Sequence, residues 1–190
     1  MQLMRLRDGT EVLVRPVEPG DKPLFEEGWK RFGEDSRYRR FMGAKPALTE
    51  RDLAFLTEVD HDDHEALGAI DPESGMGLGV ARYIRHPDRP DAAEVAVSVI
   101  DSCQGRGVGS ALLHELTALA RTRGIRVFTA CLFATNHSML RLFERVGSVH
   151  TRNVEGAALE IDVELDTADE STLHMALRSA ATGHVSERPS

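Results

Sequence analysis

The chain has 190 residues, of which 41% are hydrophobic and 28% are charged, a length and composition typical of one globular domain with short tails. Its apolar runs fall far short of the roughly eighteen residues that cross a bilayer, and its first residues lack the apolar core of a secretory signal, so we expect a cytoplasmic protein with no membrane partner. The 31 acidic against 23 basic residues give a formal net charge of -8, which disfavours nucleic acid as a partner.

The two cysteines, Cys103 and Cys131, form no CxxC pair, which argues against both a disulfide framework and a structural zinc site. We expect reduced thiols, with Cys131 in the core. Cys103 has two interpretations: a redox-sensitive thiol ahead of a helix, or a small side chain that fills space.

The first half of the chain predicts one strand and two helices. Residues 1–10 are assigned to an N-terminal segment that precedes the domain. Residues 11–17 alternate between apolar and polar, as a strand does, and the turn formers at 19–21 begin a helix that reaches about Phe32. Thr49 with Asp52 three positions later forms a capping box, which predicts a second helix.

Two polar segments in this half each allow more than one interpretation. The basic and aromatic segment 37–41 is either a nucleic-acid patch or, as the acidic total favours, an exposed loop or a contact beside a ligand. The segment 60–64, with His61 and His64 among three aspartates, is either a metal site, a set of polar contacts to a substrate, or a structural loop. Because no third placed ligand accompanies the two histidines, we expect no metal.

The middle of the chain predicts a meander followed by a long helix. Residues 66–70, 77–84 and 92–100 are strand-like runs separated by turn formers, which indicates three antiparallel strands. Apolar residues then recur at helical spacing from Val108, and Gly124 stands where a C-terminal cap belongs.

The second half predicts a buried central strand, a capped helix and a closing strand. Residues 125–133 are apolar on both faces, and Asn136 is expected to cap a helix that ends at Gly147. Residues 159–165 alternate between apolar and acidic, as a strand with one buried face does. Residues 166–190 are expected to form a short helix and a disordered tail.

A glycine-rich turn, residues 104–109, joins the third strand of the meander to the long helix. Closely spaced glycines allow backbone amides to converge on one point, and the helix dipole adds positive charge there, so such a turn suits a pyrophosphate. A dinucleotide-binding unit opens a parallel βαβ unit and carries an acidic residue about twenty positions later, neither of which occurs here. The Lys-Ser/Thr pair of a P-loop is missing too.

With Gln104, Gly107 and Gly109 in place, the sequence resembles the GNAT acetyltransferase superfamily, whose signature is Q/R-x-x-G-x-G/A. The resemblance covers residues 11–165 and implies an α/β (α+β) fold, in which a central, mostly antiparallel mixed sheet is split at the acetyl-CoA site and flanked by helices. It implies acetyl-CoA as co-substrate and no metal. Segments 60–67, 79–83 and 93–97 are similar to the bacterial Pat-type branch, which acetylates protein lysines.

The resemblance also implies roles for single residues. Glu94 stands at the position of the branch's catalytic glutamate, where it would accept the amine proton, although a solvated glutamate is the alternative. Backbone amides near Ile100 would polarise the thioester carbonyl. Arg106 either contacts the phosphates or is an exposed loop arginine. Contacts to the coenzyme are expected from Val99, Ile100, Gln104, Gly105, Arg106, Gly107, Val108, Gly109, Ser110 and Asn136.

One departure concerns the proton of the departing thiolate. Many members place a tyrosine on the helix after Asn136, whereas this chain has Phe143 near that position, so water or the amine itself would supply the proton. The predicted function is transfer of an acetyl group from acetyl-CoA to a primary amine, with a protein lysine as the first choice. The alternatives are a small-molecule acceptor, namely a polyamine, an amino acid or an aminoglycoside, and a non-catalytic acyl-CoA sensor.

Overall fold

The computed structural model describes residues 1–43 and 45–166, and within them the chain folds around one mixed sheet. The helix and tail expected after residue 166 lie outside the described residues. The strand order is β1-β2-β3-β4-β5-β6-β8-β7, and neighbours are antiparallel except for the β5/β6 pair. The expected mixed, mostly antiparallel sheet is therefore confirmed. The strands are β1 (Gln2–Arg5), β2 (Glu11–Pro16), β3 (His64–Ile70), β4 (Gly77–His86), β5 (Arg89–Val99), β6 (Val127–Phe133), β7 (Gly147–Glu155) and β8 (Ala158–Leu165).

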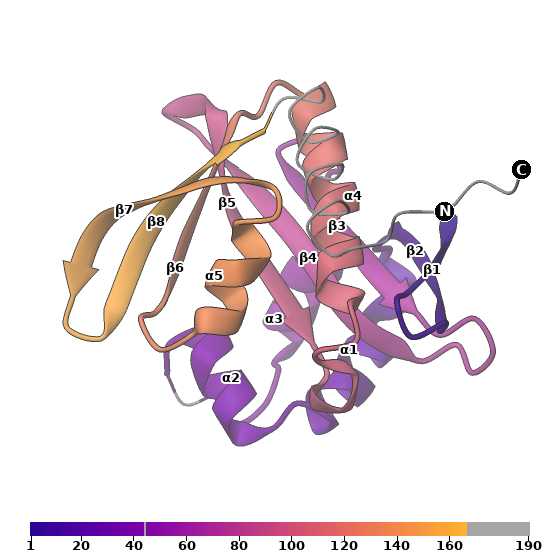
Figure 1. The fold of residues 1–190 in the computed structure, drawn as a ribbon. Helices are drawn as coiled ribbons and strands as arrows, with labels where there is room; N and C mark the ends of the chain where they lie inside the picture. Colours follow the sequence, from indigo (N-terminus) through magenta and orange to yellow (C-terminus); the bar gives the residue numbers. More distant parts are fainter. Residues whose placement is uncertain (44, 167–190) are drawn as a thin grey trace, which may run out of the picture.

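Helices cover both faces of the sheet. The long helix α4 packs across β3, β4 and β5, and Figure 1 shows it with α5 in front of the sheet and α3 behind it. Helix α1 packs on β4 and α2 reaches β6. The helices are α1 (Lys22–Lys30), α2 (Glu34–Phe41), α3 (Glu50–Thr57), α4 (Val108–Thr122) and α5 (His137–Phe143), with short 3₁₀ turns η1 (Pro19–Asp21) and η2 (Asp101–Cys103).

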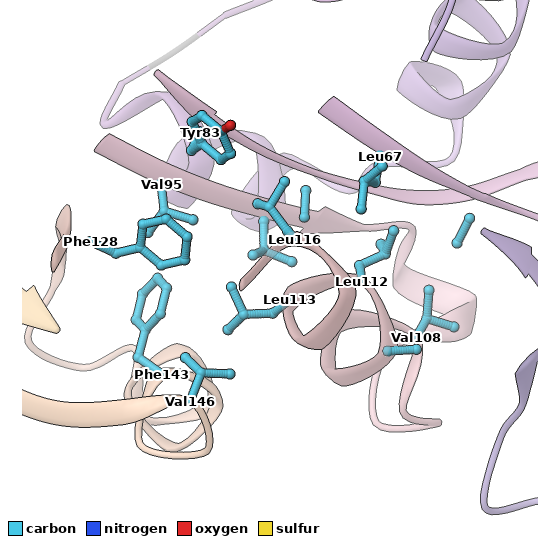
Figure 2. Close-up of a cluster of buried hydrophobic side chains, with 14 of the residues drawn as sticks. Leu67, Tyr83, Val95, Val108, Leu112, Leu113, Leu116, Phe128, Phe143 and Val146 are labelled. Atoms are coloured by element: carbon cyan, nitrogen blue, oxygen red, sulfur yellow. The ribbon is translucent and has the colours of Figure 1, made fainter. Parts of the chain in front are cut away.

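The main core lies between α4 and the sheet. Leu112, Leu113 and Leu116 of α4 are fully buried, and Figure 2 shows them pointing toward the strands that carry Tyr83 and Phe128. Each such side chain contributes about 1.5–3 kcal/mol by leaving water. The helical spacing of these leucines is the pattern that predicted the helix, because one face of α4 meets the sheet along its whole length.

Two local predictions about helix starts are confirmed by hydrogen bonds. The Thr49 hydroxyl accepts from the Asp52 amide, and the Asp52 carboxylate accepts from the Thr49 amide, which completes the capping box of α3. Asn136 caps α5 through its Oδ1, which accepts from the Met139 amide at 3.3 Å. The helix itself is shorter than expected: it ends at Phe143, and Gly147 begins β7.

Two elements of the first half were not predicted from the sequence. Residues 2–5, assigned to an N-terminal segment, form the edge strand β1 against β2. The basic and aromatic segment 37–41, expected in an exposed loop, belongs instead to helix α2. The only large apolar side chains of this helix are Tyr38 and Phe41, too few to form an apolar stripe, and its contact with the sheet includes Tyr38 stacked on Phe133 of β6 at 5.4 Å between ring centroids.

The sheet opens between β5 and β6. These two strands pair over only three positions, 92–94 with 127–129, and then diverge, as Figure 1 shows. Strand β5 continues to Val99 with its other edge still paired to β4. The part of β5 beyond Glu94 therefore has one edge free for a ligand, and the turn 104–109 lies at the end of this strand.

Candidate active site

The glycine-rich turn has the geometry of an anion-binding site. Gly105 and Gly107 have φ of +76° and +102°, in the left-handed region that L side chains rarely adopt, and Gly107 is the N-cap of α4. The first backbone bond of this helix runs from the Ala111 amide to the Gly107 carbonyl. In the described residues, none of the amides of 105–110 donates to a backbone carbonyl. Six free amides at the positive end of a fifteen-residue helix fit a pyrophosphate.

The Gln104 side chain fastens this turn to its surroundings. Its Nε2 lies 3.1 Å from the Val99 carbonyl oxygen, 3.2 Å from the Ser36 hydroxyl and 3.2 Å from an Asp101 carboxylate oxygen. The carboxylate of Asp101 in turn accepts from the Gly33 amide, at the start of α2. Gln104 therefore positions the turn against β5 and α2.

The side chain of Arg106 is hydrogen-bonded to the β1–β2 hairpin. Its Nε donates to Asp8 at 2.8 Å and its Nη2 donates to the Thr10 hydroxyl at 2.6 Å, which ties the turn to the β1–β2 hairpin. The Thr10 amide, followed by the Arg106 guanidinium, lowers the pKa of Asp8 to about 2. Arg106 is exposed and lies in the loop before α4, as one of the two interpretations expected. A contact with the phosphates stays a prediction, and Arg106 would have to leave Asp8 to make it.

The other members of the turn contribute backbone and space. Val108 is buried in the core, so only its amide faces the turn, while Ser110 is half-buried in the first turn of α4. A Cβ at Gly109 would lie 3.5 Å from side-chain atoms of Val99 and Leu142, an ordinary van der Waals contact. An alanine therefore fits there without moving the protein.

The backbone of β5 decides which amides face the opening. The Ile100 amide donates to the Leu78 carbonyl at 3.0 Å, so among the amides near Ile100 it is not one that is free to polarise a carbonyl. Hydrogen-bonded and non-hydrogen-bonded residue pairs alternate along an antiparallel ladder. Val99 belongs to the non-hydrogen-bonded pair next to Ile100, so its amide points away from β4. Asp91 lies eight positions before Val99, so both residues face the same edge of β5. The Asp91 carbonyl accepts from the Arg126 amide beside β6, which shows that this edge faces β6. Val97 and Val99 thus present their amides to the opening.

Glu94 lies where the opening begins. It is exposed, and its partner Thr129 is the last residue of β6 that pairs with β5. Glu94 lines a hollow of about 320 Å³ on the face of the sheet that α1, α2 and α3 cover. The other lining residues come from α2, α3, β4, β5 and the α2–α3 connection: Arg40, Phe41, Lys45, Asp52, Phe55, Leu56, Arg82, Ile84 and Ala96.

Two arginines of this hollow were not singled out from the sequence. Arg82 is 3% exposed and donates to the Leu56 carbonyl at 3.0 Å and to His64 Nε2 at 3.1 Å. Arg40 lies in the same hollow from α2. An arginine between Val80 and Ile84, at an inward position of an apolar strand, was the signal that could have revealed Arg82.

His64 and the aspartates around it have structural roles. The Asp60 carboxylate accepts from the amides of Asp62 and His64, both at 2.8 Å, and His61 Nδ1 contacts the buried Glu65 at 2.8 Å. Burial, followed by the charge of Arg82, lowers the pKa of His64. No three His, Cys, Asp or Glu side chains gather as metal ligands in the described part of the chain.

The cysteines differ in their surroundings. Cys103, the last residue of η2, is 5% exposed and fills space in the core, as one interpretation expected. Cys131 is exposed, so its expected place in the core is wrong. The reason is that β6 has already parted from β5 at this position, which leaves the strand face uncovered.

Comparison with known proteins places these features in a family. Residues 25–147 match the acetyltransferase (GNAT) family, a span that includes the diverging strands, the glycine turn and Asn136. The chain belongs to this family. GNAT proteins use acetyl-CoA as co-substrate, and the free amides of the turn fit the pyrophosphate of that molecule. Phe143, near the position where many GNAT members carry a tyrosine, is 1% exposed and packs in the core.

Individual GNAT relatives support this placement. The acetyltransferase Pat of Mycolicibacterium smegmatis is 34% identical over 161 residues, which are 84% of this chain and 48% of that protein. The acetyltransferase PA5475 of Pseudomonas aeruginosa is 30% identical over 154 residues, 78% of this chain and 80% of its own. The crystal structure of the GNAT domain of S. lividans PAT aligns with a TM-score of 0.78 at 32% identity, covering 86% of this chain and 96% of that one. This chain thus spans about half the length of the first relative. No helix in the described ranges is long and apolar enough to cross a membrane.

Proposed function

We propose that this chain transfers the acetyl group of acetyl-CoA to the primary amine of a protein lysine, with Glu94 as the base. One observation carries the proposal. The free amides of residues 105–110 and the carboxylate of Glu94 lie toward the two ends of the stretch of β5 that no longer pairs with β6. A donor held by its phosphates at one end would extend along the strand edge toward the base at the other.

The residues at the donor end bind and orient the coenzyme. The amides of 105–110 hold the pyrophosphate, and the outward amides of Val97 and Val99 meet the arm that follows it. Acetyl-CoA supplies an activated acyl group as a thioester. Val97 is three residues from Glu94, about 10 Å at 3.3 Å per residue, whereas Val99 is about 16 Å away. The Val97 amide is therefore the better placed donor to the thioester oxygen.

The residue at the acceptor end accepts the proton that the amine loses. A lysine amine with a pKa near 10.4 is only about one part in a thousand neutral at pH 7.4, so transfer at neutral pH gains from a base. Glu94 takes the amine proton, directly or through one water, as the new N–C bond forms and the C–S bond breaks. Because Phe143 is a buried side chain without a hydroxyl, water supplies the proton to the departing thiolate.

The choice of acceptor rests on similarity and on the hollow. The resemblance of segments 60–67, 79–83 and 93–97 to the Pat-type branch supports a protein lysine, and the similarity to the acetyltransferase Pat over most of this chain agrees with that branch. A small amine is the second candidate, because a hollow of about 320 Å³ has the size of a small-molecule site. Two free cysteines are in keeping with action in a reducing compartment such as the cytoplasm.

The proposal is tested by a turnover screen that follows release of free coenzyme A with candidate proteins, lysine peptides and small amines. Turnover on folded proteins or lysine peptides that exceeds turnover on polyamines, amino acids and aminoglycosides would support the protein acceptor. Turnover confined to small amines would favour the second candidate. Acetyl-CoA binding without turnover on any acceptor would contradict both and favour a sensor.

We expect Asn136→Ala to raise KM for acetyl-CoA about tenfold, a loss of about 1.4 kcal/mol, while its melting temperature falls by a few degrees at most. The cap uses only Oδ1 of this residue, at a long 3.3 Å, so the amide nitrogen stays available to the pantetheine arm. Steady-state kinetics and thermal melting of the same preparation check this. Unchanged kinetics with a loss of about 1 kcal/mol of stability would make Asn136 a helix cap only.

A further inference from the structure

The hollow beside Glu94 contains two arginines of which neither has a carboxylate partner. Arg82 is buried, and its guanidinium donates only to the carbonyls at the end of α3 and to His64. Arg40 lines the same hollow, and the structure records no hydrogen bond from its guanidinium to any described residue. No described carboxylate lies within 4.0 Å of either arginine.

The remaining charges of the hollow do not neutralise this pair. Lys45 and Asp52 are paired with each other at 2.8 Å. Glu94 is then the one acidic side chain left to face two guanidinium groups, so the lining as a whole carries an excess of one positive charge. The rest of the chain, by contrast, is acidic, with a net charge of -8. The excess is therefore a local property of this hollow.

The positive charges of the two arginines also repel each other. Burial, followed by the like charge of Arg40, lowers the pKa of Arg82 to about 9. Burial lowers the pKa of Arg40 as well, and the charge of Glu94 opposes that effect. A buried and a half-buried cation without an ion-pair partner are unfavourable, and a carboxylate between them would relieve this cost through charge-assisted hydrogen bonds.

The two residues differ in what else they do. Arg82 stabilises the C-terminal end of α3 by donating to the Phe55 and Leu56 carbonyls, which is a structural role. Arg40 has no such bond, and its nearest recorded contact is the face of the Phe41 ring, at 5.1 Å. Arg40 is thus the one whose guanidinium is free to meet a ligand.

We propose that Arg40, supported by Arg82, binds a carboxylate that the acceptor carries close to its reactive amine. The inference rests on the proposed function and specifies its acceptor: the amine meets Glu94 while the carboxylate meets Arg40. The carboxylate has two possible sources, an acidic side chain next to the lysine of a protein or the α-carboxylate of a free amino acid. Both place an anion within a few ångströms of the amine.

The test compares matched acceptors with and without this carboxylate. One pair consists of blocked peptides with Glu-Lys or Gln-Lys at their centre, and the other of leucine and leucinamide. The kcat/KM ratio within each pair is measured for the wild type, Arg40→Gln and Arg39→Gln. Arg39 is an exposed arginine on the same helix, so its variant controls for a general loss of positive charge. Arg82 is not substituted, because its loss would leave carbonyls at the end of α3 without a hydrogen-bond donor.

We expect the wild type to prefer the carboxylate in one pair by about tenfold or more, and Arg40→Gln to abolish that preference. Leucinamide has a lower amine pKa than leucine, which by itself alters the kcat/KM ratio of that pair. This contribution is the same for both enzymes, so the decisive quantity is the change in the ratio from wild type to Arg40→Gln. A response of the peptide pair identifies a protein source, and a response of the leucine pair a free amino acid. Arg39→Gln keeps the wild-type preference.

Two other results would overturn the inference. If the wild type acetylates amines with no preference for the carboxylate, or Arg40→Gln keeps that preference, then the arginines have no part in acceptor binding, while the proposed acetyl transfer stands. If no amine is acetylated at all, the proposed function fails and this inference fails with it. Thermal melting and acetyl-CoA affinity of Arg40→Gln, both expected at wild-type values, show that the variant is folded.

Discussion

Glu94→Gln lowers kcat about a hundredfold at neutral pH and leaves the affinity for acetyl-CoA close to that of the wild type, if Glu94 is the base. The substitution keeps the size of the side chain and removes its capacity to take a proton. Glu94 is exposed and makes no recorded hydrogen bond to a described residue, so we expect the substitution to change the free energy of unfolding little. Turnover kinetics and calorimetric binding of acetyl-CoA check the two halves of this expectation.

The pH dependence separates a lost base from a disturbed site. As pH rises toward the amine pKa near 10.4, more of the acceptor is neutral before it binds, so the variant needs the base less and its deficit shrinks. A packing defect would leave a constant deficit. Glu11→Gln, an exposed carboxylate at the start of β2, is the matched control and keeps wild-type turnover at every pH. An unchanged rate of Glu94→Gln at neutral pH would remove Glu94 as the base.

Gly107→Val is expected to weaken acetyl-CoA binding more than tenfold. With φ at +102°, an L side chain at this position costs about 1–2 kcal/mol and a β-branched one more, so the turn would relax and its amides would no longer converge. Isothermal calorimetry on folded protein measures the loss. Gly124→Ala is the matched control, because Gly124 has φ of +78° and open space around it, but lies at the far end of α4. Wild-type affinity in Gly107→Val would exclude the turn as the coenzyme site.

Gly109 gives a complementary test, because its φ is not in the left-handed region. Gly109→Val would also crowd Val99 and Leu142, so weaker binding in that variant would have two explanations. Gly109→Ala makes only ordinary contacts with the protein, and we expect it to keep its melting temperature. A loss of acetyl-CoA affinity in this variant would therefore report the close approach of the coenzyme. Equal affinity would mean that the glycine serves packing alone.

Local patterns determined much of this protein. The leucine spacing of α4, the capping box at Thr49 and the cap at Asn136 depend on residues within a few positions of each other, so the sequence alone predicted them. The glycine turn is local in the same sense, since its function depends on consecutive amides. The turn led to the resemblance to the family, and the resemblance to the coenzyme, while Glu94 as the base stays a prediction.

Tertiary structure decided what depends on distant segments. Helix α2 has no apolar stripe and is held by contacts with β6 and the turn, which no local pattern reports. The pairing of β5 with β4 engages the Ile100 amide and turns that of Val99 toward the opening. Arg40 and Arg82 are 42 positions apart and share a hollow only because α2 and β4 meet in the folded chain. Propensity and capping act over a few residues, whereas the charge of a binding site is the sum of side chains brought together by the whole fold.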